Sequence, residues 1–340
     1  MFFTTDHIRF LQKLTLKKFV NGIKLWSSYH VSRLTKKNWI WGEPLAISIE
    51  PTTACNLGCP ECPSGLKAFT RKTGNLNQSL NKKIIDENAD KLIYANYYFQ
   101  GEPFINPNFL EMVSYASEKG IHTSTSTNAH FISKDVAEKT VKSGLDRLII
   151  SIDGTTQETY ESYRVHGDLN KVIEGTKNIL NAKNELKSAT PHVIFQFLVV
   201  KPNEHQIEDI KTLGEELGVD EVRFKTAQVY DYKHGNRLIP TIEKYSRYRK
   251  TKNGTYVLKN KMVNQCWRMW HSCVSTWDGK IVPCCFDKDA THQLGDLKNE
   301  TLKSVWKNKG YQEFRASILH SRSEIDICKN CSEGTKVWAE

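Results

Sequence analysis

"LAISIE" (residues 45–50) runs directly into "PTTACNLGCPEC" (residues 51–62), so a strand-like apolar run leads into three closely spaced cysteines. Cys55, Cys59 and Cys62 follow the spacing C-x3-C-x2-C. A zinc site built from these three alone would lack its fourth ligand. A [4Fe–4S] cluster differs, because three thiolates can hold it while one iron stays open to a small molecule. The stretch predicts a metal-binding loop at the carboxyl end of a first strand.

Further strand-like runs alternate with helical segments along the chain. The helical segments 106–120 and 203–218 each close on a glycine, as helix carboxyl ends often do. Strands that alternate with helices predict parallel βαβ units, as an open sheet or a partial barrel. Functional groups in such folds lie at the carboxyl ends of the strands. The expected strands are 45–50, 96–100, 122–127, 147–152, 192–200 and 221–225.

Composition excludes several classes of protein. The chain has 340 residues, 39% of them hydrophobic, and no apolar run near the ~20 residues that a membrane span needs. No secretory signal pattern precedes the first strand, so we expect a cytoplasmic protein. In that compartment nine cysteines bind metal or do redox chemistry more often than they form disulfides.

The net charge of +10 is concentrated in residues 1–44, which hold eight Lys or Arg against two acidic residues. An apolar stripe recurs there at helical spacing. Its members are Leu16, Phe19, Val20, Ile23 and Trp26. We expect this helix to dock on the main domain through the stripe, with peripheral contact to an anionic membrane as the alternative. Nucleic-acid binding is not expected, because the remaining charge surrounds no recognition motif.

A second group of cysteines lies between residues 266 and 331. Cys266 and Cys284, with the C-x2-C pair Cys328 and Cys331, make a closed four-thiolate site that suits zinc or a fully ligated iron–sulfur cluster. Residue chemistry alone slightly favours zinc. Cys273 and Cys285 are left over, either as buried thiols or as replacements for Cys266 or Cys284.

The first cysteine motif resembles the signature of the radical S-adenosylmethionine (SAM) enzymes, in which the methionine end of SAM fills the open iron. "FQGEP" (99–103), "TSTNA" (125–129), "SIDG" (151–154) and "YRVHG" (163–167) are similar to that family's later motifs and follow in the same order. The SAM-binding residues that the resemblance implies are Gly101, Glu102, Pro103, Ser126, Asn128, Ser151, Asp153 and Arg164.

Particular roles follow from the same resemblance. Ser151 and Arg164 would bind the SAM carboxylate, for which a guanidinium fork is suited. Gln100 replaces the first glycine of a Gly-Gly-Glu-Pro motif, and Glu61 stands where the family has an aromatic residue near the adenine.

The carboxyl-terminal cysteines resemble the auxiliary-cluster modules called SPASM and twitch. The resemblance implies one auxiliary [4Fe–4S] cluster on Cys266, Cys284, Cys328 and Cys331, because no cysteine follows Cys331. The implied fold is α/β, a partial (β/α)6 TIM-type barrel with a small iron–sulfur cluster-binding module. The implied divisions are a basic helical extension (1–44), the barrel (45–230), a connecting segment (231–262) and the cluster module (263–340).

The resemblance implies an oxidoreductase-type enzyme that cleaves SAM reductively and abstracts hydrogen from a substrate. The auxiliary cluster would take back an electron or bind the substrate, and a flavodoxin- or ferredoxin-type reductase would supply the electron. The short extension predicts a small polar substrate, including a sugar- or lipid-linked one. A peptide-modifying maturase is the alternative, and a non-catalytic iron–sulfur or zinc protein is a second one. No residue is assigned to substrate catalysis.

Overall fold

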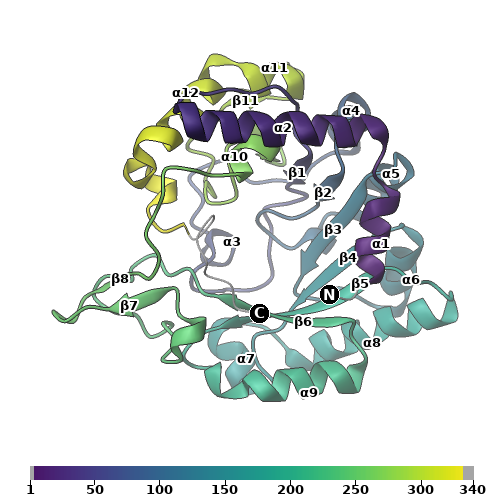
Figure 1. The fold of residues 1–340 in the computed structure, drawn as a ribbon. Coiled ribbons are helices and arrows are strands. Elements are labelled where there is room, and N and C mark those ends of the chain that lie inside the picture. The colour runs from purple at the N-terminus through teal and green to yellow at the C-terminus, as the bar shows by residue number, and fades with distance from the viewer. Residues whose placement is uncertain (1–3, 332–340) are drawn as a thin grey trace.

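The computed structural model describes residues 4–331 (Figure 1). In this part of the chain one sheet of nine strands has the order β11-β10-β9-β1-β2-β3-β4-β5-β6. Its six consecutive strands are β1 (Ala46–Ile49), β2 (Tyr94–Asn96), β3 (His122–Thr127), β4 (Arg147–Ser151), β5 (His192–Val199) and β6 (Glu221–Thr226). Each pairs in parallel with the next, which confirms the predicted α/β class and the consecutive strand order of a partial barrel.

Helices connect the strands and cover the outside of the sheet (Figure 1). They are α3 (Pro63–Leu66), α4 (Gln78–Asn88), α5 (Phe109–Glu118), α6 (Lys134–Lys142), α7 (Gln157–Tyr163), α8 (Leu169–Glu185) and α9 (Ile207–Leu217), with single turns η1 (Pro103–Ile105) and η2 (Glu204–Gln206). Side chains on the inner helix faces and on the strands form the main apolar core, and a second, smaller cluster lies around Leu57 and Tyr163. Gly218, with φ of 79°, ends α9 in the left-handed conformation that its sequence predicts.

The prediction of the second strand at 96–100 is wrong, because β2 covers Tyr94–Asn96. Strand β2 ends at Asn96, and only the Tyr97 N–H continues the pairing by donating to the Ser124 carbonyl at 2.7 Å. The Tyr97 side chain is fully buried and its hydroxyl donates to Asn81 Oδ1 at 2.9 Å. Residues 97–100 therefore form the bend that leads out of the sheet.

The carboxyl-terminal module extends the same sheet. It comprises α10 (Arg268–His271), β9 (Ser272–Ser275), β10 (Lys280–Val282), β11 (Gly295–Asp296), α11 (Leu302–Lys307), α12 (Lys309–Ser321), η4 (Arg322–Glu324) and η5 (Asp326–Cys328). Strand β9 pairs in parallel with β1, with Cys273 opposite Ile47, so the barrel and the module share a hydrogen-bonded ladder.

The segment between barrel and module carries η3 (Glu243–Tyr245) and the antiparallel hairpin of β7 (Tyr248–Lys250) and β8 (Tyr256–Leu258). The four divisions named from the sequence stay predictions, and residues 332–340 of the predicted module lie outside the described residues.

Two helices precede the barrel, α1 (Thr5–Gln12) and α2 (Leu16–Thr35). Helix α1 lies against the amino ends of β3 and β4, where Asp6 pairs with His122 at 3.0 Å and with Arg147. Arg9 pairs with Asp146 at 3.1 Å.

Helix α2 packs on α10, but not through its apolar stripe. The five stripe side chains are 41–78% exposed, so the prediction that they dock on the main domain is wrong. The opposite face is buried because its polar groups find partners there. Lys18 Nζ, for example, donates to the Gly120 carbonyl at 2.7 Å. Among residues 4–331, no helix has the length and apolar character to cross a bilayer.

Candidate functional site

A cavity of ≈ 240 Å³ opens at the carboxyl ends of the barrel strands. The loop after β1 contributes Cys55, Cys59 and Cys62 to its wall. Six of the eight residues predicted to bind SAM also line it, namely Gly101, Glu102, Ser126, Asn128, Ser151 and Arg164. The ends of four separate strands deliver these groups to one place, except for Arg164, which follows α7.

Two of the three thiols lie next to hydrogen-bond donors. Cys55 Sγ accepts from the Leu57 N–H at 3.5 Å and lies 4.0 Å from Asn128 Nδ2. Arg164 Nη1 lies 3.9 Å from Cys59 Sγ. Burial raises the pKa of the Cys55 thiol to about 12 and also raises the pKa of Cys59. The thiols of Cys55 and Cys59 are therefore protonated at neutral pH unless a cation replaces the protons, while the hydrogen-bond donors around them favour thiolate.

The arrangement of the three cysteine ligands fits an iron–sulfur cluster better than a single metal ion. Thiolates around one zinc, with Zn–S of about 2.3 Å, would lie about 3.8 Å from one another. Within residues 4–331, no three His, Cys, Asp or Glu side chains converge in the way a single metal ion requires. A [4Fe–4S] cluster spreads its thiolates over separate irons and suits a wider spacing.

Arg164 is held in place from behind. Asp153 is fully buried and accepts from Arg164 Nε at 2.5 Å with one oxygen and from the Leu198 N–H at 2.7 Å with the other. Asp153 does not line the cavity, but it aims the guanidinium toward Cys59. Ser151 Oγ lies 3.4 Å from Ser126 Oγ on the neighbouring strand end. Together, Arg164, Ser151 and Ser126 can bind a carboxylate beside the thiols.

Glu102 is 2% exposed, and its carboxylate is already bonded. It accepts from the Thr127 hydroxyl and the Asn128 N–H, both at 2.7 Å. Burial raises the pKa of Glu102 to about 7 despite these donors. Pro103 begins η1 behind the cavity. Gly101, with φ of 75°, stands where a Cβ would lie 2.3 Å from the Thr52 carbonyl oxygen, so only glycine fits.

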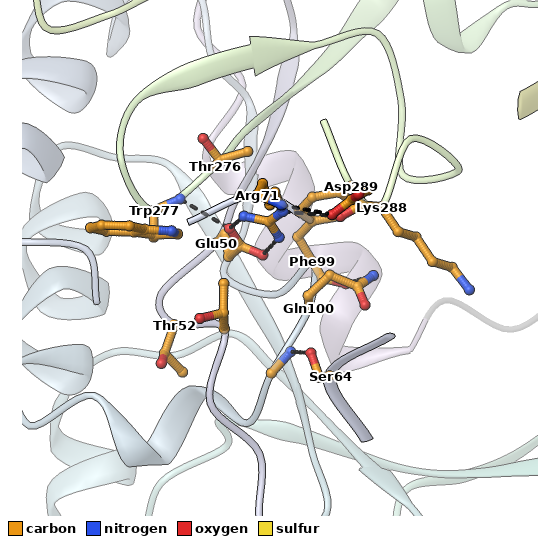
Figure 2. Close-up of polar contacts among 12 residues, drawn as sticks. Glu50, Thr52, Ser64, Arg71, Phe99, Gln100, Thr276, Trp277, Lys288 and Asp289 are labelled. Atoms are coloured by element: carbon orange, nitrogen blue, oxygen red, sulfur yellow. Dashed lines mark hydrogen bonds and ion pairs between the residues drawn. The ribbon is translucent and has the colours of Figure 1, made fainter. Parts of the chain in front are cut away.

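A buried ion pair links the barrel, the cysteine loop and the module (Figure 2). Glu50, at the end of β1, accepts from both Nη atoms of Arg71, at 2.5 and 2.8 Å. Glu50 also accepts from the Trp277 N–H at 3.1 Å, and Arg71 Nε donates to the Lys288 carbonyl at 3.1 Å. Asp289 accepts from the Arg71 N–H at 3.2 Å. We call these five residues the clasp; it sets the module against the wall of the cavity.

The carboxyl-terminal cysteines form a second group, in which Cys266, Cys328 and Cys331 are buried and Cys284 is half-buried. Burial raises the pKa of the Cys328 thiol to about 12, and the nearby Cys331 and Cys266 thiols raise it further. Burial likewise raises the pKa of Cys284, with Cys266 and Cys331 among its neighbours. The fully buried Arg322 donates to Cys331 Sγ at 3.3 Å. Three of these thiols, Cys266, Cys328 and Cys331, lie near this buried cation, which suits an anionic cluster.

The two leftover cysteines lie in different places. Cys273 is buried on β9. Burial raises the pKa of its thiol to about 12, and the charge of Arg315 opposes that shift. Cys285 adjoins Cys284. It also contributes to the raised pKa of Tyr98, which lines the cavity. Which thiols ligate a cluster stays a prediction, with Cys285 as the rival that the geometry leaves near the site.

Several residues of the site have no signal in the sequence. Lys288 and Gln196 line the cavity, Arg322 contacts Cys331, and Arg71 pairs with Glu50, all from segments without a motif. Glu50 had one usable signal, because a charged residue directly after a buried strand needs a partner.

Two family models match the chain and together span most of it. The radical SAM superfamily model matches residues 49–214, and that of an iron–sulfur cluster-binding domain, SPASM, matches residues 266–332. The chain belongs to the radical SAM superfamily. The protein is a radical SAM enzyme with a carboxyl-terminal SPASM-type module. Its cofactors are a SAM-binding [4Fe–4S] cluster, SAM and auxiliary iron–sulfur clusters.

Relatives extend the similarity over nearly the whole chain. The tungsten-containing aldehyde ferredoxin oxidoreductase cofactor-modifying protein of Pyrococcus furiosus is 23% identical over 84% of this chain and 86% of its own. The PqqA peptide cyclase of Bradyrhizobium diazoefficiens is 23% identical over 86% of this chain and 79% of its own. Streptococcus suis SuiB, solved with S-adenosylmethionine, has a TM-score of 0.63 at 16% identity, covering 90% of this chain and 76% of that one.

Proposed function

We propose that this enzyme generates a radical from SAM beside Cys55, Cys59 and Cys62 and abstracts hydrogen from a peptide. The observation that carries the radical chemistry is the convergence of these three thiols, Asn128 and Arg164 on one cavity. The peptide substrate is supported by the similarity to a peptide cyclase along most of the chain. The comparisons thus favour the peptide alternative over the small-molecule prediction.

In this proposal, a [4Fe–4S] cluster with bound SAM supplies the 5′-deoxyadenosyl radical. Arg164, aimed by Asp153, binds the SAM carboxylate together with Ser151. Asn128 donates toward the Cys55 sulfur and fixes the loop through Asn56 Oδ1, which accepts from it at 2.8 Å. Tyr98 and Leu198 wall the cavity and limit the access of water.

A small polar substrate is the second candidate, and Lys288 is the observation that favours it. Lys288 reaches the cavity from the module, with Nζ 3.4 Å from the Glu61 carbonyl and 4.8 Å from the Tyr230 ring centroid. Lys288 and Arg164 both line the cavity, and two cations there would bind an anionic group of a compact substrate. The auxiliary cluster would then accept an electron and make the reaction a net oxidation.

The test uses anaerobically reconstituted protein with SAM and a strong reductant, and measures 5′-deoxyadenosine. A cell extract is separated into a peptide fraction and a small-molecule fraction, and each is added with and without prior protease treatment. We expect the peptide fraction to stimulate formation of 5′-deoxyadenosine and protease to abolish the effect. Stimulation by the small-molecule fraction alone would support the second candidate, and no 5′-deoxyadenosine under any condition would refute both.

A further inference from the structure

Helix α2 is oriented with polar residues inward. Lys18, Asn21, Ser28 and Ser32 are buried, and each makes hydrogen bonds. Asn21 donates to the Glu43 carbonyl at 2.8 Å and accepts from the Glu43 N–H at 2.9 Å. This reciprocal pair fixes the rotation of the helix about its axis, because turning it would leave buried polar groups unpaired.

Aromatic packing fixes the same orientation. Tyr29 lies inward, with ring centroids 5.2 Å from Trp267 and 5.4 Å from Trp270. A Cβ on Gly42 would lie 2.7 Å from the Leu25 side chain, so the segment that follows the helix passes tightly beneath it. The inward face of α2 is therefore built for its place.

The outward face of α2 consists of Leu16, Phe19, Val20, Ile23, Trp26 and Leu34. Their exposed fractions are 78, 51, 41, 49, 59 and 83%, respectively. Such a row of large apolar side chains in water is unfavourable and marks an interaction surface. Figure 1 shows α2 along the outer edge of the molecule, on the side away from α7, α8 and α9.

The charges around this face identify the partner. Residues 7–42 contain eight Lys or Arg and no acidic residue. At 100° per residue, the exposed Lys17 and Lys24 fall along one edge of the outward face, and the exposed Lys36 and Lys37 follow its carboxyl end. Trp39 and Trp41, just beyond, are 43 and 47% exposed. Apolar and tryptophan side chains bordered by lysine match the boundary between acyl chains and anionic headgroups.

We propose that the outward face of α2 docks on the surface of an anionic lipid bilayer. The helix, about 30 Å long, would lie in the plane of the membrane with its apolar row in the headgroup boundary. The lysines would contact anionic headgroups. The enzyme would then work at a membrane surface without spanning it.

Vesicle sedimentation tests this with full-length, cluster-loaded protein. Vesicles of phosphatidylcholine alone are compared with vesicles that contain one-quarter phosphatidylglycerol. We expect sedimentation with the anionic vesicles, weakened when salt rises to about 0.5 M, where charges are screened beyond about 4 Å. Lys17→Glu/Lys24→Glu should lower the partition coefficient tenfold or more, since one basic residue near the surface changes it about fivefold.

Two further variants make the test specific. Phe19→Ser/Trp26→Ser removes apolar contact without touching the inward face and should abolish sedimentation. Lys171→Glu/Lys177→Glu reverses two exposed lysines on α8 and should behave as wild type. Circular dichroism and iron content confirm that each variant is folded.

Absence of wild-type sedimentation with anionic vesicles would overturn the proposal, as would equal loss in the α8 variant. A concentration-dependent dimer that Phe19→Ser/Trp26→Ser dissociates, with no vesicle binding, would assign the outward face to a second copy of the chain instead.

Discussion

Arg164 stands between an acidic partner and a sulfur, with Nε on Asp153 and Nη1 near Cys59. One edge of its guanidinium pairs with the fixed carboxylate of Asp153, and the other edge faces the cavity. That geometry makes it the residue whose removal should separate SAM binding from cluster binding.

Arg164→Ala should weaken SAM binding by about 1.5–3 kcal/mol, the usual worth of a charge-assisted hydrogen bond to a carboxylate. Iron content should not change, because no thiol is altered. Equilibrium dialysis on reconstituted protein measures the affinity, and Arg223→Ala, on the Glu221 pair of β6, is the matched control. Unchanged affinity in Arg164→Ala would show that the carboxylate binds elsewhere.

At this scale the sequence was informative only where residue type and spacing coincide. The thiol loop and the motifs at strand ends could be located because each is local. The partners Glu50 and Arg71 are 21 residues apart and lie in no shared pattern. Arg322 meets Cys331 only because η4 and η5 fold back on each other, which no periodicity encodes.

At the scale of elements, α2 shows what amphipathic spacing can and cannot predict. The period of the apolar residues correctly predicts a helix, but the period alone does not say which face is inside. Burying a lysine or asparagine is unfavourable unless it is bonded, and here backbone carbonyls supply those bonds. Those acceptors come from distant segments, so the sequence could not reveal them.

Helix α1 offers a pH test of element docking. Burial alone would raise the pKa of Asp6, but hydrogen bonds from His122 and Arg147 hold it well below its usual range. An acid whose pKa is lowered by folding stabilises the fold fully above its unfolded pKa of about 3.9, and this stabilisation is lost as pH falls below that value.

Asp6→Asn should therefore loosen α1 at pH 7 by about 2–4 kcal/mol, because Arg147 and His122 lose their buried partner. Amide hydrogen exchange in residues 5–12 measures the opening. The difference between variant and wild type should shrink as pH is lowered below about 4. A difference that stays constant as pH falls well below 4 would mean that Asp6 is not the anchoring charge.

At the scale of the whole molecule, the two cysteine groups predict two separate clusters. Reconstituted protein should hold about eight irons per chain. Replacing Cys55, Cys59 and Cys62 together with Ala should remove about half of the iron and all SAM cleavage.

Single replacements separate the auxiliary ligands. Cys284→Ala should lose auxiliary-cluster absorption, whereas Cys273→Ala, in the β9 core, should keep it. Retention by Cys284→Ala together with loss in Cys285→Ala would exchange the assignment of these two thiols. One zinc with four irons would refute the auxiliary cluster but not the radical chemistry.

The clasp should make barrel and module unfold together. Arg71→Met leaves Glu50 buried without its partner, which typically costs about 3–5 kcal/mol. The double variant Glu50→Gln/Arg71→Met removes both charges and should recover much of that loss. Urea unfolding followed by tryptophan fluorescence measures both, and equal stability of the two variants would show that the ion pair is not coupled.

The pairing of β1 with β9 also governs how the chain is made. Strand β1 receives its outer neighbour from residues synthesised more than two hundred positions later. Until the ribosome releases that segment, the nascent barrel exposes unpaired backbone groups along an open edge, a template for aggregation. A polypeptide cut after residue 262 should consequently form large particles in light scattering, and a monomeric one would mean that the barrel closes on its own.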